Sequence, residues 1–84
     1  MFYVYVLADQ DGELYFGSTK DLKQRISEHR SGQSRSTKGR DWKLIYYEAY
    51  CNEQDARERE QKIKYHGQAK RWLKRRLRNS LKQS

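Results

Sequence analysis

The N-terminal stretch FYVYVLADQDGELYFG (residues 2–17) carries the clearest structural pattern of this chain. Its first six residues are mostly aromatic or β-branched, which is typical of a strand covered on both faces. Asp11-Gly12 follows, and a tight turn is expected there because glycine adopts positive φ at little cost. Residues 13–17 then return as a second strand. We therefore predict an antiparallel hairpin that carries Tyr5 on one strand and Tyr15 on the other.

Capping residues and apolar spacing predict the elements that follow the hairpin. A helix is expected from its cap at 21 to about 30, a third strand over 42–50, a second helix from its cap at 52 to about 67, and a basic helix over about 68–81. The order β-β-α-β-α-α predicts a single domain over residues 1–84. Its fold class is α/β in the broad sense, and more narrowly the α+β type. Its helices flank a small three-stranded antiparallel sheet.

The charges are distributed unevenly along these 84 residues, whose net charge is +8. All 11 acidic residues lie at or before Glu60, whereas 9 of the 19 basic residues follow it. Such a block of one sign is the electrostatic footprint of a protein that binds phosphates. A solvated helical face is the alternative, but nine unopposed charges would repel one another. We therefore expect a nucleic acid as the partner rather than an anionic membrane.

Other bulk properties exclude several classes of protein. No apolar stretch is long enough to cross a membrane, and the N-terminus lacks the pattern of a signal peptide, so a cytoplasmic location is expected. Cys51 is the only cysteine, which excludes an intramolecular disulfide and a cysteine-based zinc cluster. We expect it to be a small buried side chain.

Two basic regions contain residues whose role the sequence does not decide. In the last helix the apolar residues lie at helical spacing, so we expect them to pack on the domain rather than to read bases; they are Trp72, Leu73, Leu77 and Leu81. The loop over 31–41 is polar and basic, and it is either a substrate contact or a tether.

Three polar side chains lie beside apolar stripes and need an explanation. Arg25 and His29 are four residues apart and share a helix face next to the apolar stripe. Glu60 is expected on the stripe of the second helix that faces the core, where a carboxylate is costly unless it is paired or binds a metal. An ion pair of Glu60 with Arg25 or Lys64 is the plain alternative.

These residues together resemble the GIY-YIG endonuclease family over roughly residues 2–64. Tyr3-Val4-Tyr5 and Tyr15-Phe16-Gly17 stand in the places of the two tripeptides of that family, with Tyr3 instead of a glycine and Phe16 instead of an isoleucine. The family keeps Arg-x-x-x-His on a catalytic helix, which corresponds to Arg25 and His29. Gly17 leaves room for a close approach of backbone or phosphate.

The resemblance implies a stand-alone, UvrC-like enzyme that hydrolyses phosphodiester bonds in DNA. Its catalytic residues would be Tyr5, Tyr15, Arg25, His29 and Glu60. Glu60 would be the protein ligand of a divalent metal, Mg²⁺ or else Mn²⁺, since one carboxylate with several waters suits magnesium. The general base would be Tyr5, favoured as phenolate by a neighbouring guanidinium, or His29, and the sequence leaves both open.

Nucleic-acid contacts are expected at ten further positions: Gly17, Lys20, Arg35, Lys38, Arg40, Lys64, Lys70, Arg71, Lys74 and Arg75. We expect DNA to be recognised by its structure rather than its sequence, as in repair or processing. The competing hypothesis is a non-catalytic nucleic-acid-binding module that retains the fold. RNA as substrate, a partner protein in repair, and a monomer or weak dimer all stay open.

Overall fold

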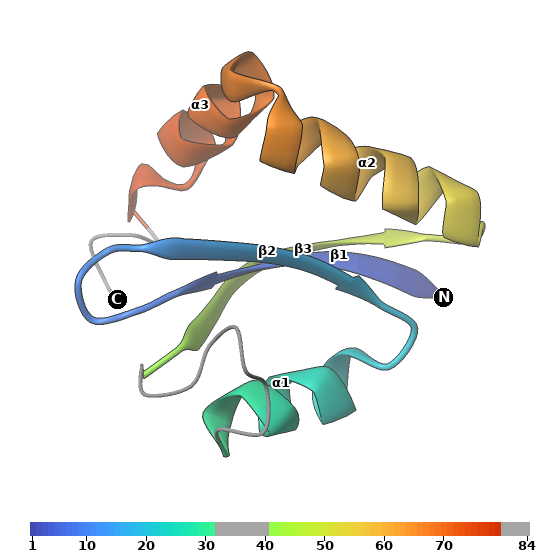
Figure 1. Cartoon of the computed structure of the whole chain (residues 1–84), viewed down its shortest axis with the longest axis horizontal. Coiled ribbons are helices and arrows are strands. Elements are labelled where there is room, and N and C mark those ends of the chain that lie inside the picture. The colour runs from blue at the N-terminus through green and yellow to red at the C-terminus, as the bar shows by residue number, and fades with distance from the viewer. Residues whose placement is uncertain (32–40, 80–84) are drawn as a thin grey trace.

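The computed structural model describes residues 1–31 and 41–79. It contains β1 (Phe2–Ala8), β2 (Leu14–Thr19), α1 (Leu22–Arg30), β3 (Lys43–Tyr50), α2 (Glu53–Tyr65) and α3 (Gly67–Arg76), as Figure 1 shows. The predicted order and the α+β fold class are confirmed. The loop residues Arg35, Lys38 and Arg40 lie outside the described residues, as does Leu81.

The sheet is antiparallel, with β1 in the centre and β2 and β3 at its edges. The turn between β1 and β2 is held by Asp9, whose carboxylate accepts hydrogen bonds from the backbone N–H groups of Asp11 and Glu13 at 2.9 and 2.8 Å. Gly12 has a φ of +82°, a conformation that favours glycine. These contacts fix the register in which Tyr5 lies opposite Gly17.

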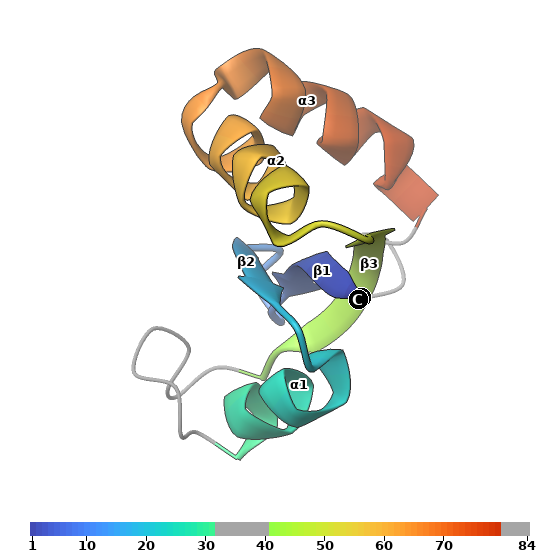
Figure 2. The same cartoon turned by 90° about the vertical axis from the view of Figure 1, so that its right-hand side faces the viewer.

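Helices cover both faces of this sheet. Figure 1 shows α1 on one face and α2 with α3 on the other, and Figure 2 shows the same layers from the side. On the α2 face the core contains Val4, Val6 and Ile63, and on the α1 face it contains Tyr5 and Leu7. Because β1 contributes to both cores, the expectation that this strand is covered on both faces is confirmed.

Two burial predictions are wrong. Cys51 is exposed, because it lies in the bend between the end of β3 and the cap of α2. Trp72 is 66% exposed, whereas Leu73 and Leu77 are buried as predicted. The two leucines are four residues apart and define the buried stripe of α3, so a residue one position before Leu73 points about 100° away from that stripe.

Helix caps are formed as the sequence predicts. The carboxylate of Asp21 accepts a hydrogen bond from the backbone N–H of Gln24, and the side chain of Asn52 accepts from Gln54 and Asp55. The first helix therefore begins directly after β2, and the second begins directly after β3. No helix among residues 1–31 and 41–79 is long and apolar enough to cross a membrane.

Candidate active site

Tyr5 is placed by the pairing of β1 with β2. It lies opposite Gly17, and the two residues share the α1 face of the sheet. A Cβ atom at Gly17 would overlap the Tyr5 hydroxyl and lie only 2.6 Å from its Cζ atom. The phenol therefore runs across Gly17 and occupies the space that a side chain would need. The sequence predicted a close approach of backbone or phosphate at Gly17, whereas in the structure the atoms that lie close to Gly17 belong to the Tyr5 side chain.

The Tyr5 hydroxyl is hydrogen-bonded to Nε2 of His29, which α1 contributes from the opposite layer, at 2.9 Å. Both side chains are 1% exposed. Tyr15 completes the cluster, with ring centroids 6.3 Å from Tyr5 and 5.0 Å from His29, and it is only partly buried. The structure thus brings together three of the five predicted catalytic residues, from three separate segments.

Burial sets the protonation of this pair. It is the main reason why the pKa of Tyr5 lies above its ordinary value of 10.0, and it outweighs the opposing effect of Arg25. Burial, and next the positive charge of Arg25, lower the pKa of His29 below 6.5. At neutral pH the contact therefore joins a neutral phenol to a neutral imidazole. Arg25 acts in the expected direction, since it lowers the pKa of Tyr5 and so favours phenolate, but burial has the larger effect in this arrangement.

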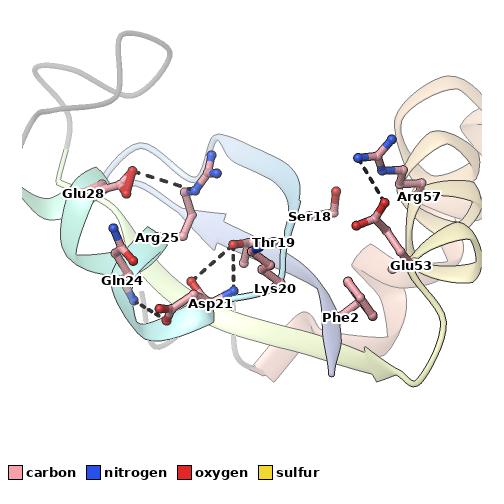
Figure 3. A pocket seen from close by; sticks show the side chains of 11 residues that line it. Phe2, Ser18, Thr19, Lys20, Asp21, Gln24, Arg25, Glu28, Glu53 and Arg57 are labelled. Carbon is pink, nitrogen blue, oxygen red and sulfur yellow. Dashed lines mark hydrogen bonds and ion pairs between the residues drawn. The ribbon is translucent and has the colours of Figure 1, made fainter.

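Arg25 lies on α1 one turn before His29 and reaches solvent. Its Nε is 3.9 Å from a carboxylate oxygen of Glu28, a weak contact between partly exposed groups. Arg25 also lines a pocket of about 440 Å³ together with Lys20, and Figure 3 shows this pocket between α1 and the first turn of α2. The guanidinium can thus turn toward an anion in the pocket while its charge still acts on Tyr5 and His29.

Glu60 lies on the other face of the sheet, in α2. Its Oε1 accepts a hydrogen bond from the Ser18 hydroxyl at 2.5 Å, and its Oε2 is 2.8 Å from the Lys64 ammonium. The ion pair with Lys64 that the sequence left as an alternative is therefore present, and the pair with Arg25 is absent from the described residues. The side chain of Glu60 is 19% exposed and so is accessible from solvent.

The two halves of the site meet at edge strand β2. Gly17 touches Tyr5 on one face, and the next residue, Ser18, binds Glu60 on the other. The carboxylate is close enough to contribute to the raised pKa of Tyr5. Sequence reasoning did not identify Ser18 as the partner of Glu60. The alternation of side chains along a strand shows on which face of the sheet a residue lies, but not which helix covers that face.

Glu60 is the residue of this site that would hold a metal. Among the described residues no three His, Cys, Asp or Glu side chains lie close enough together to form a metal-binding group. A lone, partly exposed carboxylate suits Mg²⁺, which keeps several waters and takes further oxygens from a substrate phosphate. Glu60 fits that description once Lys64 releases its Oε2.

The predicted nucleic-acid contacts divide by location. Lys20 lines the pocket beside Arg25, Lys64 is paired with Glu60, and the Lys70 ammonium lies 5.5 Å from the centre of the Phe16 ring. The remaining described cations of that set, Arg71, Lys74 and Arg75, are exposed on α3. Lys64 and Lys70 therefore also make contacts within the fold.

A tyrosine pair on a β-hairpin, packed against the Arg-x-x-x-His face of the next helix, is the arrangement that the resemblance to the GIY-YIG family implies. Residues 1–75 match the family described as the GIY-YIG catalytic domain, and the chain belongs to that family. The recognition made from the tyrosine spacing is thereby confirmed.

Several relatives have names that state no activity. A UPF0213 protein from the ldhD 5' region of Pediococcus acidilactici is 42% identical over 77 residues, covering 76% of this chain and 79% of that protein. A UPF0213 protein of Clostridium perfringens is 42% identical over 66 residues, covering 76% and 71%. The solution structure of a UPF0213 protein from Bacillus halodurans has a TM-score of 0.57 at 29% identity and covers 92% of this chain and 87% of its own.

Proposed function

We propose that this protein is a metal-dependent endonuclease that hydrolyses phosphodiester bonds in DNA. It would select its substrate by structure rather than sequence and act in DNA repair or processing in the cytoplasm. The observation that carries the proposal is the buried hydrogen bond between Tyr5 and His29. Apolar residues would fill this position at lower cost, so two titratable groups held in contact beside Arg25 favour a catalytic role.

We propose a proton relay as the base of the reaction. Neutral His29 accepts the Tyr5 proton at Nε2, and the Tyr5 oxygen takes a proton from the attacking water. No free phenolate is then needed, which suits a phenol whose pKa is raised by burial. The relay requires the imidazole proton on Nδ1. It also requires substrate binding to bring the water to the edge of β2 above Gly17, because Tyr5 is 1% exposed.

Arg25 and Tyr15 would act on the substrate itself. The planar guanidinium of Arg25 can bind two phosphate oxygens and stays charged as negative charge develops. Tyr15 is the partly exposed member of the aromatic cluster and would position the water or the phosphate. Glu60 would hold Mg²⁺, which supplies positive charge to the phosphate during hydrolysis. Mn²⁺ prefers the same kind of ligand and is expected to replace it.

The second candidate function is a nucleic-acid-binding module that does not cleave. One observation favours it: both carboxylate oxygens of Glu60 are engaged, one by Ser18 and the other by Lys64. If this ion pair is permanent, Glu60 is a structural residue and the basic surface alone would serve binding.

Cleavage of end-labelled single-stranded, duplex and branched DNA, with Mg²⁺ or with EDTA, separates the two candidates. We compare Glu60→Ala with Glu58→Ala, which removes an exposed carboxylate from the same helix. The nuclease proposal predicts Mg²⁺-dependent cleavage that Glu60→Ala abolishes, without loss of DNA binding, and that Glu58→Ala retains. Salt-sensitive binding without cleavage of any substrate would instead support the binding module.

A further inference from the structure

A second groove lies on the opposite side of α2 from the candidate active site. Successive residues of α2 reach different strands: Arg59 binds Glu48 of β3, and Glu60 binds Ser18 of β2. The groove on the β3 side has a volume of about 460 Å³ and is formed by β3, α2 and α3. Its lining includes Trp72, which is the only described tryptophan that is exposed.

Among the described residues, Glu48 is the one carboxylate that lines this groove, and its charge is balanced by Arg59. Glu48 receives two hydrogen bonds from Arg59, at 2.9 and 3.1 Å. It receives two more from the hydroxyls of Tyr46 and Tyr50, at 2.7 and 2.5 Å. Burial alone would raise the pKa of Glu48, but these bonds outweigh it and hold the pKa below the ordinary 4.5. The carboxylate is thus a charge-compensated part of the groove wall.

Two cations of the groove remain unopposed. Lys62 from α2 and Arg76 from α3 both line it, and within the part of the chain that the structure describes neither has a carboxylate within ion-pair distance. Arg76 is four residues after Trp72 and therefore lies on the same side of α3. An exposed indole can stack on a base, and the cations around it can bind the phosphates of the same strand.

We propose that this groove binds an unpaired nucleotide of a single strand, with the base stacked on Trp72 and its phosphates bound by Lys62 and Arg76. The proposal rests on the proposed function in one respect, namely that the substrate is a nucleic acid. The groove would hold an unpaired segment on the side of α2 away from Glu60. A second copy of the chain is a poorer occupant, because both copies carry a net charge of +8.

The test is equilibrium binding in EDTA, so that cleavage plays no part. The probes are a short oligothymidylate and an abasic strand of equal length, which keeps the phosphates and removes the bases. The variants are Trp72→Ala and Trp72→Phe, with Tyr65→Ala as the control because Tyr65 is 78% exposed and lies outside the groove.

Trp72→Ala should weaken binding of the oligothymidylate by roughly 5- to 150-fold, the effect of losing one stacked base. Trp72→Phe should keep most of the affinity, and Tyr65→Ala should match the wild type. Binding of the abasic strand should be the same in all four proteins. Binding of the oligothymidylate should also quench the fluorescence of Trp72 in the wild type, and this quenching should be absent from Trp72→Ala.

Unchanged affinity in Trp72→Ala would overturn the proposal, as would an equal loss for the abasic strand. A wild-type dimer that Trp72→Ala converts to a monomer would also overturn it, since the groove would then be a self-association site. The outcome is separate from that of the proposed function. A protein that cleaves DNA while Trp72→Ala binds normally refutes only the groove, and base-dependent binding without cleavage refutes only the nuclease.

Discussion

Substitution of Gly17 by alanine tests the arrangement on which the candidate site is built. The new methyl group would lie 2.6 Å from Cζ and 3.0 Å from Cε1 of Tyr5, and closer still to the hydroxyl oxygen. The ring cannot move freely, because Tyr5 is 1% exposed and its hydroxyl is bonded to His29. Either the phenol leaves His29 or β1 and β2 separate locally.

The cost follows from these two contacts. Overpacking a buried position costs about 1–3 kcal/mol. Loss of the hydrogen bond between Tyr5 and His29 costs a further ~0.5–1.5 kcal/mol. We therefore expect Gly17→Ala to lower the free energy of unfolding by roughly 2–4 kcal/mol, a large part of the total for a domain of this size.

The assay is urea unfolding followed by tryptophan fluorescence, with Gly67→Ala as the matched control. No atom lies within 4 Å of a Cβ built at Gly67, the first residue of α3, so this variant should be neutral or slightly stabilised. In a Tyr5→Phe background the cost of Gly17→Ala should fall, because the closest atom is gone. If Gly17→Ala costs no more than Gly67→Ala, the proposed path of the Tyr5 side chain is wrong.

Three further predictions concern charge. Arg25→Ala should move the acid limb of the cleavage rate to higher pH in a pH–rate profile, because Arg25 lowers the pKa of His29. Folding lowers the pKa of His29 below 6.5, so the neutral imidazole stabilises the fold above pH 6.5 and the melting temperature should drop as the pH falls below that value. If the melting temperature of a His29→Gln variant depended on pH in the same way, this prediction would be wrong. Arg59→Ala should cost about 1–3 kcal/mol in urea unfolding because it removes two bonds to Glu48, whereas Arg57→Ala, from an exposed pair, should cost less than about 1 kcal/mol; equal costs would refute this.

Local rules were sufficient to predict the order of elements. Strand composition, the Asp11-Gly12 turn and the helix caps at Asp21 and Asn52 each act within a few residues, and the structure contains all of them. The resemblance to the GIY-YIG family implied that Tyr5, Tyr15 and His29 belong to one site, and these side chains do meet in the structure.

Contacts between distant segments could not be predicted in the same way. Nothing local indicates that Tyr5 covers Gly17, because this depends on the pairing register of two strands. The partner of Glu60 depends on where α2 lies over β2. The exposure of Trp72, by contrast, follows from local spacing, since Leu73 and Leu77 define a buried stripe that excludes it.

Single-turnover cleavage of labelled DNA in Mg²⁺ decides whether Tyr5 takes part in hydrolysis. Tyr5→Phe keeps the ring and removes only the hydroxyl that binds His29, while Tyr47→Phe makes the same change at a tyrosine that is 53% exposed. We predict that Tyr5→Phe lowers the rate by about 10²- to 10⁴-fold with unchanged DNA affinity, and that Tyr47→Phe cleaves like the wild type. Cleavage by Tyr5→Phe at the wild-type rate would mean that the Tyr5 hydroxyl takes no part in hydrolysis.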